Sequence, residues 1–188
     1  NSGINSSINS SDRKKLIPKR AILPYFLRVK DQNTKLWRSW NVTPGLEARF
    51  IQSVRMKPRR TASGVATITV ITRPHTCSSN CIYCPCDLRM PKSYIANEPA
   101  CQRAELAFFD PYIQVAVRLQ ALHQMGHSTD KIELIVLGGT WSDYPASYQY
   151  WFIRELFRAL NEWPHSPQHI EKRTDWYRSF GLQNTEEA

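Results

Sequence analysis

Residues 65–84 read VATITVITRPHTCSSNCIYC, and this stretch decides how the chain folds. The first eight residues, 65–72, are rich in β-branched side chains and lack glycine and proline, which is typical of a β-strand. The residues that follow contain a proline and three cysteines, and they predict a long loop from Arg73 to about residue 97. A strand that leads directly into such a loop is typical of the carboxyl-terminal edge of an α/β sheet, where these folds place their functional sites.

Beyond this loop the chain alternates between helix and strand signals. Residues 99–108 and 110–126 predict two helices, and the second has an apolar stripe along one face. Residues 132–137, IELIVL, predict a second strand, and their nearly continuous apolar character favours burial on both faces. Residues 147–161 predict a last helix. The order strand, loop, helix, strand, helix predicts an α/β fold with parallel pairing and right-handed crossovers.

The positive charge of the chain is concentrated before the first strand. Residues 1–60 contain 14 Lys and Arg against three acidic residues, whereas the rest of the chain contains 11 against 13. Clustered basic side chains gain free energy by releasing counterions from nucleic acid, so residues 13–60 predict a mainly helical arm that binds a polyanion. A solvated basic surface is the alternative interpretation. Residues 1–12 are rich in Ser and Asn and are expected to form a disordered tail.

Composition narrows the class of protein further. The five cysteines are odd in number and lie between Cys77 and Cys101, which argues against a disulfide framework and for a metal centre. No apolar run reaches the roughly 20 residues that span a bilayer, and the first residues show no signal peptide. We therefore expect a cytoplasmic protein without a membrane partner.

The cysteines Cys77, Cys81 and Cys84 have the spacing C-x3-C-x2-C. Three thiolates on one short loop can bind three irons of a 4Fe-4S cluster and leave the fourth iron without a protein ligand. S-adenosylmethionine (SAM) can chelate that iron, and electron transfer into its sulfonium releases a 5′-deoxyadenosyl radical. The motif therefore predicts that the three cysteines are the protein ligands of a 4Fe-4S cluster. A structural zinc site with Cys86 or His75 as fourth ligand, and a chance grouping of cysteines, are the alternatives.

A second feature supports a SAM site. Gly138 and Gly139 end the second expected strand, and because glycine has no side chain, their carbonyl groups are open to hydrogen bonds from the SAM amino group. Tyr83 lies between the last two cysteines of the motif and is a candidate to stack on the adenine ring. The alternatives are an ordinary Gly-Gly turn and an aromatic core residue.

Several segments resemble one known family in order and spacing. These are residues 57–75 (KPRRTASGVATITVITRPH), 93–104 (SYIANEPACQRA), 110–114 (DPYIQ) and 126–141 (GHSTDKIELIVLGGTW). They are similar to the catalytic subunit of Elongator and its bacterial and archaeal relatives, over about residues 55–160. The resemblance implies a tRNA uridine acetyltransferase that acts at C5 of the wobble uridine, with SAM and acetyl-CoA as co-substrates.

The resemblance also implies roles for particular residues. The three cysteines of the motif would bind the cluster, and Gly138, Gly139 and Thr140 would contact SAM. The basic stretch before Thr61 would help to hold tRNA. The individual candidates for this contact lie next to the barrel and are Arg55, Lys57, Arg59 and Arg60.

The chain departs from the family in its extent. The family has a radical SAM partial TIM barrel with more strand–helix units, followed by an acetyltransferase domain, whereas this chain supplies about two units and no acetyltransferase segment. Residues 61–164 therefore predict an incomplete barrel, and residues 165–188 a C-terminal remnant or tail. We expect a fragment or truncated form that needs the rest of the barrel or an acetyltransferase domain, with acetyl-CoA used only in a full-length relative. The alternatives are a zinc-stabilised RNA-binding module and a radical SAM enzyme with another substrate.

Overall fold

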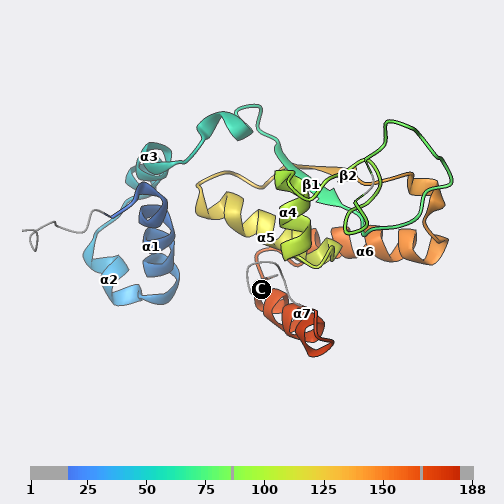
Figure 1. Ribbon diagram of the computed structural model, residues 1–188. Coiled ribbons are helices and arrows are strands. Elements are labelled where there is room, and N and C mark those ends of the chain that lie inside the picture. The colour runs from blue at the N-terminus through green and yellow to red at the C-terminus, as the bar shows by residue number, and fades with distance from the viewer. Residues whose placement is uncertain (1–16, 86, 166, 183–188) are drawn as a thin grey trace, which may run out of the picture. The chain divides into compact units, whose positions relative to one another are not determined.

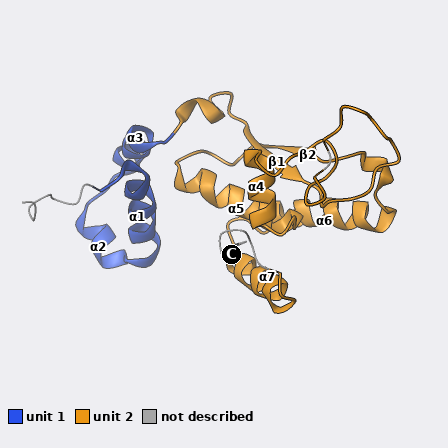
Figure 2. Ribbon diagram, in the orientation of Figure 1, with its two compact units in different colours: residues 1–56 blue, residues 57–188 orange. Residues whose placement is uncertain are grey.

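The computed structural model describes residues 17–85, 87–165 and 167–182. They form two compact units, residues 1–56 and residues 57–188 (Figure 2). The boundary falls inside the basic segment expected over residues 13–60, so this segment contributes to both units. The tail expected at residues 1–12 lies outside the described residues.

The first unit is helical, as the sequence predicted. Its helices are α1 (Lys19–Gln32), α2 (Thr34–Ser39) and α3 (Pro44–Val54). Thr43 caps α3 by accepting a hydrogen bond from the Leu46 N–H at 3.3 Å. Phe26 of α1 contacts the rings of Trp37 and Phe50, with centroids 5.2 and 4.5 Å away. Phe26 is thus buried with Leu23 and Val29 of the same helix, and half-buried rings of the basic segment pack against it.

The second unit is built on a two-stranded parallel sheet (Figure 1). Strands β1 (Ala66–Ile71) and β2 (Ile132–Leu137) pair residue by residue from one end to the other. Around them lie the helical elements η2 (Pro58–Thr61), α4 (Pro99–Leu106), α5 (Pro111–Gln124), η3 (Trp141–Asp143), α6 (Ala146–Asn161) and α7 (Pro167–Ser179). The expected order of strands and helices and their parallel pairing are confirmed. No helix in the described ranges is long and apolar enough to cross a membrane.

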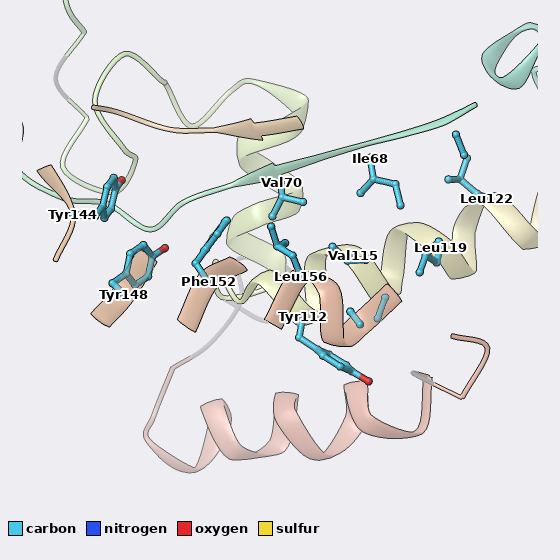
Figure 3. Close-up of a cluster of buried hydrophobic side chains, with 13 residues drawn as sticks. Ile68, Val70, Tyr112, Val115, Leu119, Leu122, Tyr144, Tyr148, Phe152 and Leu156 are labelled. Atoms are coloured by element: carbon cyan, nitrogen blue, oxygen red, sulfur yellow. The ribbon is translucent and has the colours of Figure 1, made fainter. Parts of the chain in front are cut away.

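Helices α5 and α6 cover one face of the sheet. Ile68 and Val70 of β1 point towards these helices, where they meet Val115 of α5 and Phe152 of α6 (Figure 3). The cluster of buried residues comprises Ala66, Ile68, Val70, Tyr112, Val115, Ala116, Leu119, Leu122, Tyr144, Tyr148, Phe152, Leu156 and Ala159. Burial of this apolar surface is the main force that holds the unit together.

The prediction that the second strand is buried on both faces is wrong for this chain. Glu133 and Ile135 of β2 are exposed, and Ile135 retains 38% of its accessible surface. Val136 is also exposed. Among the described residues only β1 pairs with β2, and the helices α5 and α6 cover one face. An apolar sequence shows that a strand is suited to burial, but its neighbours decide whether it is buried.

Helix α7 lies in the region 165–188, for which the sequence predicted only a remnant or tail. Its Arg173 forms ion pairs with Asp110 and Glu155, whose side chains are each 2% exposed. The Arg173 guanidinium also lies 4.2 Å from the centre of the Tyr112 ring. Because this helix docks largely through charged groups, it has no strong apolar stripe that sequence reading could detect.

Candidate cofactor site

The candidate site lies where the two parallel strands end. Thr72 directly follows β1, and Gly138 directly follows β2. Because the strands are parallel and in register, the segments that leave them start side by side at one edge of the sheet. The cysteine loop is the first of these segments, and the stretch from Gly138 to η3 is the second.

These two segments enclose a cavity of about 520 Å³. Its lining residues are Cys77, Ser79, Asn80, Cys81, Ile82, Tyr83, Cys84, Lys92, Ser93, Gly138, Gly139 and Thr140. All seven residues that the sequence singled out as cluster ligands or SAM contacts are among them. The structure therefore brings together two motifs that are more than 50 residues apart in the chain.

The three motif cysteines are free thiols on the wall of this cavity. The Cys77 sulfur lies 3.2 Å from the Thr140 hydroxyl, and the Cys84 sulfur lies 3.5 Å from the Ser93 hydroxyl. Cys81 is exposed. In the described part of the chain, no three Cys, His, Asp or Glu side chains are grouped so that they could hold one ion. The thiols thus share a cavity without converging on one point.

Of the two candidates for a fourth zinc ligand, His75 is engaged elsewhere in the structure. The His75 Nε2 donates a hydrogen bond to the backbone carbonyl of Asp143 at 3.0 Å, and its ring stacks on Tyr144. His75 is not among the lining residues. Cys86 lies outside the described residues. Cys101 is buried on α4, and burial raises the pKa of its thiol.

Asp143 anchors the start of the cysteine loop. Its carboxylate accepts hydrogen bonds from the Ser78 N–H at 2.7 Å and from the Ser78 hydroxyl at 3.0 Å. The bond from the N–H lowers the pKa of Asp143, because it favours the charged form. This contact ties the residue next to Cys77 to the segment after β2. Asp143 was not predicted from the sequence, although it is an acidic residue that closely follows the Gly-Gly turn.

Close packing leaves no space for a side chain at position 138, so only glycine fits there. A Cβ atom at this position would lie 1.9 Å from the Thr72 hydroxyl oxygen, and the residue has a φ of +157°. Thr72 is held in place because its hydroxyl lies 2.8 Å from that of Tyr144, which in turn donates to the Arg73 carbonyl. Gly139 differs, since its nearest neighbour would be the Lys92 Cβ at 3.4 Å.

Tyr83 is 90% exposed on the loop, and its neighbour Ile82 is also fully exposed. The ring of Tyr83 is thus on the cavity wall but is not part of a packed core. This placement is compatible with a stacking role and removes the alternative that the aromatic residue is a core residue. Adenine stacking by Tyr83 stays a prediction.

The four basic candidates for tRNA contact are divided between the two units. Arg55 ends α3 in the first unit, and its Nε is buried without a hydrogen-bond partner among the described residues. Lys57, Arg59 and Arg60 belong to the second unit and are exposed at or in η2. Three of the four are thus freely accessible on the unit that carries the cysteine cavity.

Known proteins are similar to more than half of this chain. A protein of Methanocaldococcus infernus named tRNA uridine(34) acetyltransferase is 45% identical over 119 residues, which is 60% of this chain. A protein of the same name from Dehalococcoides mccartyi is 46% identical over 105 residues, or 56% of the chain. Human Elongator complex protein 3 is 39% identical over 131 residues, or 64% of the chain. No protein-family model matches the chain.

These matches confirm the resemblance that the motifs indicated. The chain is homologous to proteins named tRNA uridine(34) acetyltransferase and Elongator complex protein 3. It covers 22%, 23% and 24% of the lengths of these three relatives, so it spans about a quarter of each. The homology therefore concerns one part of each of these longer relatives.

Proposed function

We propose that this chain is the cluster-binding part of a radical SAM enzyme that modifies the wobble uridine of tRNA. In this proposal Cys77, Cys81 and Cys84 bind a 4Fe-4S cluster, and the segment Gly138–Thr140 contacts SAM. The observation that carries the proposal is the shared cavity, which collects all of these residues from two distant motifs. The names of the homologues, which specify uridine 34 of tRNA, support the choice of substrate.

The donor types suit such a cluster. Three free thiols from one loop line the same cavity, and neither His75 nor the buried Cys101 supplies a further donor there, while Cys86 lies outside the described residues. A set of three thiolates leaves one iron open for SAM, whereas a structural zinc site needs four protein ligands. When bound, the cluster and SAM supply reductive cleavage of a carbon–sulfur bond in SAM.

The protein supplies placement for this chemistry. Asp143 holds the loop at Ser78, next to the first cysteine ligand. The Thr140 hydroxyl lies within hydrogen-bond distance of the Cys77 sulfur, so it can donate to the thiolate and orient it. Thr72 and Gly138 are closely packed, and this keeps the Gly138 backbone against the end of β1.

The tRNA part of the proposal rests on charge and homology. Residues 1–60 carry most of the basic character of the chain, and Lys57, Arg59 and Arg60 are exposed on the second unit. Counterion release makes such a segment suited to a phosphate backbone. Acetyl transfer would need the remainder of the longer protein, because the chain covers about a quarter of its relatives.

Anaerobic reconstitution with iron and sulfide tests the metal centre. We expect a brown protein with about four irons per chain. The Cys81→Ala variant should lose the iron, whereas the matched Cys101→Ala variant should keep it, because Cys101 is buried on α4 away from the cavity. A colourless protein that binds one zinc instead would contradict the proposal and favour a zinc-stabilised RNA-binding module.

Product analysis tests the reaction. With a strong reductant, the reconstituted chain should cleave SAM to 5′-deoxyadenosine and should not consume acetyl-CoA. The full chain should also bind tRNA with a strong dependence on salt. SAM cleavage without any tRNA binding would indicate a radical SAM enzyme with another substrate, and acetyl-CoA turnover by this chain alone would contradict the proposed division of labour.

A further inference from the structure

A second cavity, of about 150 Å³, lies between α4 and α5, away from the cysteine site. Its wall is mainly apolar and includes Ala100 of α4 and Val117 of α5. Two cationic side chains, Arg103 and Arg118, also line it. Thr69 places the cavity beside β1.

The cavity lies at the edge of β1 that faces away from β2. The Ala66 N–H donates to the carbonyl of Lys131, just before β2, and the Thr72 N–H donates to that of Leu137 at its end. Alternation along a parallel strand therefore turns the backbone of Thr69 and Ile71 outward. The Gln114 carboxamide takes the place of a neighbouring strand at Ile71. It accepts from the Ile71 N–H and donates to the Ile71 carbonyl, both at 2.9 Å. The Gln114 side chain thus covers the β1 edge at Ile71, and the cavity beside Thr69 is left open to a ligand.

Two arginines from different helices line this cavity, and a third, Arg60, interacts electrostatically with one of them, Arg118. Arg103 comes from α4, Arg118 from α5 and Arg60 from η2. Burial lowers the pKa of the Arg118 guanidinium, and the positive charges of Arg103 and Arg60 lower it further. Arg118 is half-buried, whereas Arg103 and Arg60 are exposed, so desolvation acts on Arg118 and a bound negative charge would offset it.

The described residues supply no such charge. Among them, no carboxylate forms an ion pair with any of the three arginines. The nearby acid Glu105 on α4 instead interacts electrostatically with Arg89. Residues 61–188 contain more acidic than basic side chains, so the placement of Arg103 and Arg118 on one cavity without an ion-pair partner is not a consequence of composition.

We propose that Arg60, Arg103 and Arg118 form a binding site for a phosphate group of an RNA backbone. Arginine is suited to this ligand because its planar guanidinium forms paired hydrogen bonds with phosphate oxygens. RNA is the favoured source because Arg60 ends the basic stretch of residues 1–60, so the site extends that stretch onto α4 and α5. The inference rests on the RNA-binding part of the proposed function and adds two contact residues, Arg103 and Arg118.

Salt-dependent binding of a tRNA to the full chain tests the site. We expect Arg103→Gln and Arg118→Gln each to weaken binding several-fold and to reduce the slope of log K against log salt by roughly 1, which is the effect of one lost phosphate contact. Lys172→Gln is the matched control, because it removes the same charge from an exposed position on α7. This control should leave the slope unchanged.

Inorganic phosphate separates the possible sources of the ligand. At constant ionic strength, phosphate should raise the melting temperature of the wild type more than that of Arg118→Gln, since a ligand that binds the native state stabilises it. Phosphate stabilisation with unaltered tRNA binding in both arginine variants would overturn the RNA assignment. The RNA assignment would also be overturned if the salt slope were unchanged in the two arginine variants but reduced by Lys57→Gln and Arg59→Gln. In that case the proposed function would still stand. If the wild type binds no tRNA, the proposed tRNA substrate and this inference both fail.

Discussion

The helix-covered face of the sheet and its carboxyl-terminal edge are built in opposite ways. The face is apolar and closed, and Ile68, Val70 and Phe152 are completely buried in it. The edge is lined by cysteines, hydroxyl groups and glycines around an open cavity. Both regions are formed by the same two strands, which supply side chains to the face and their terminal segments to the edge.

This difference separates stability from function. The buried face contributes most of the free energy of folding, because it removes the most apolar surface from water. The edge contributes less, and its groups remain accessible for ligands. Substitutions in the two regions should therefore differ in size and in the property that they change.

The largest expected effect is in the buried face. Phe152→Ala should lower the free energy of unfolding by about 3–5 kcal/mol, because it removes a fully buried ring and leaves a cavity. Phe157→Ala is the matched control on the same helix, where the ring is 56% exposed. Urea unfolding of both variants measures the contrast. Equal losses in the two variants would show that the face is less closely packed than described.

A smaller effect is expected at the edge. Gly138→Ala should destabilise the protein by about 1–3 kcal/mol, because the new methyl group collides with the hydroxyl of Thr72. Gly139→Ala should cost less, since only ordinary contact with Lys92 results. In thermal unfolding, Thr72→Ala combined with Gly138→Ala should recover part of the loss. No recovery would mean that backbone strain at Gly138, rather than the collision, sets the cost.

The smallest expected effect concerns the charged contacts of α7, and it depends on pH. Hydrogen bonds from Tyr112, Arg158 and His169 hold the pKa of Glu162 at about 2, below its usual value of 4.5. A lowered carboxyl pKa stabilises the folded state above the unfolded pKa, and this contribution is lost as pH falls towards 2. The contribution should be less than about 1 kcal/mol, because the Glu162 side chain is partly exposed.

Urea unfolding at pH 7 and at pH 3 measures this contribution. The wild type should lose more stability between the two pH values than Glu162→Gln, which cannot titrate. Lys172→Gln, which removes a charge from an exposed position on α7, should follow the wild type. If Glu162→Gln showed the same pH dependence as the wild type, the low pKa of Glu162 would be refuted.

The sequence was sufficient for elements whose signal is local. The strands at residues 66–71 and 132–137 and the cap of α5 at Asp110 follow from β-branched runs and from an Asp-Pro helix start. It was insufficient for α7, because that helix is held by ion pairs to residues 63 and 18 positions earlier, such as Asp110 and Glu155. Such contacts leave no periodic pattern in the segment itself.

The cysteine spacing and the Gly-Gly turn were evident from the sequence alone, because each motif is a local arrangement of residue types. Only the tertiary structure placed both motifs on one cavity and showed that Thr72 excludes any side chain at position 138. It also brought Arg103 and Arg118 to one cavity beside β1. The physical reason is that parallel pairing and helix packing join segments far apart in the chain, and the distances between them are set by the whole folded unit.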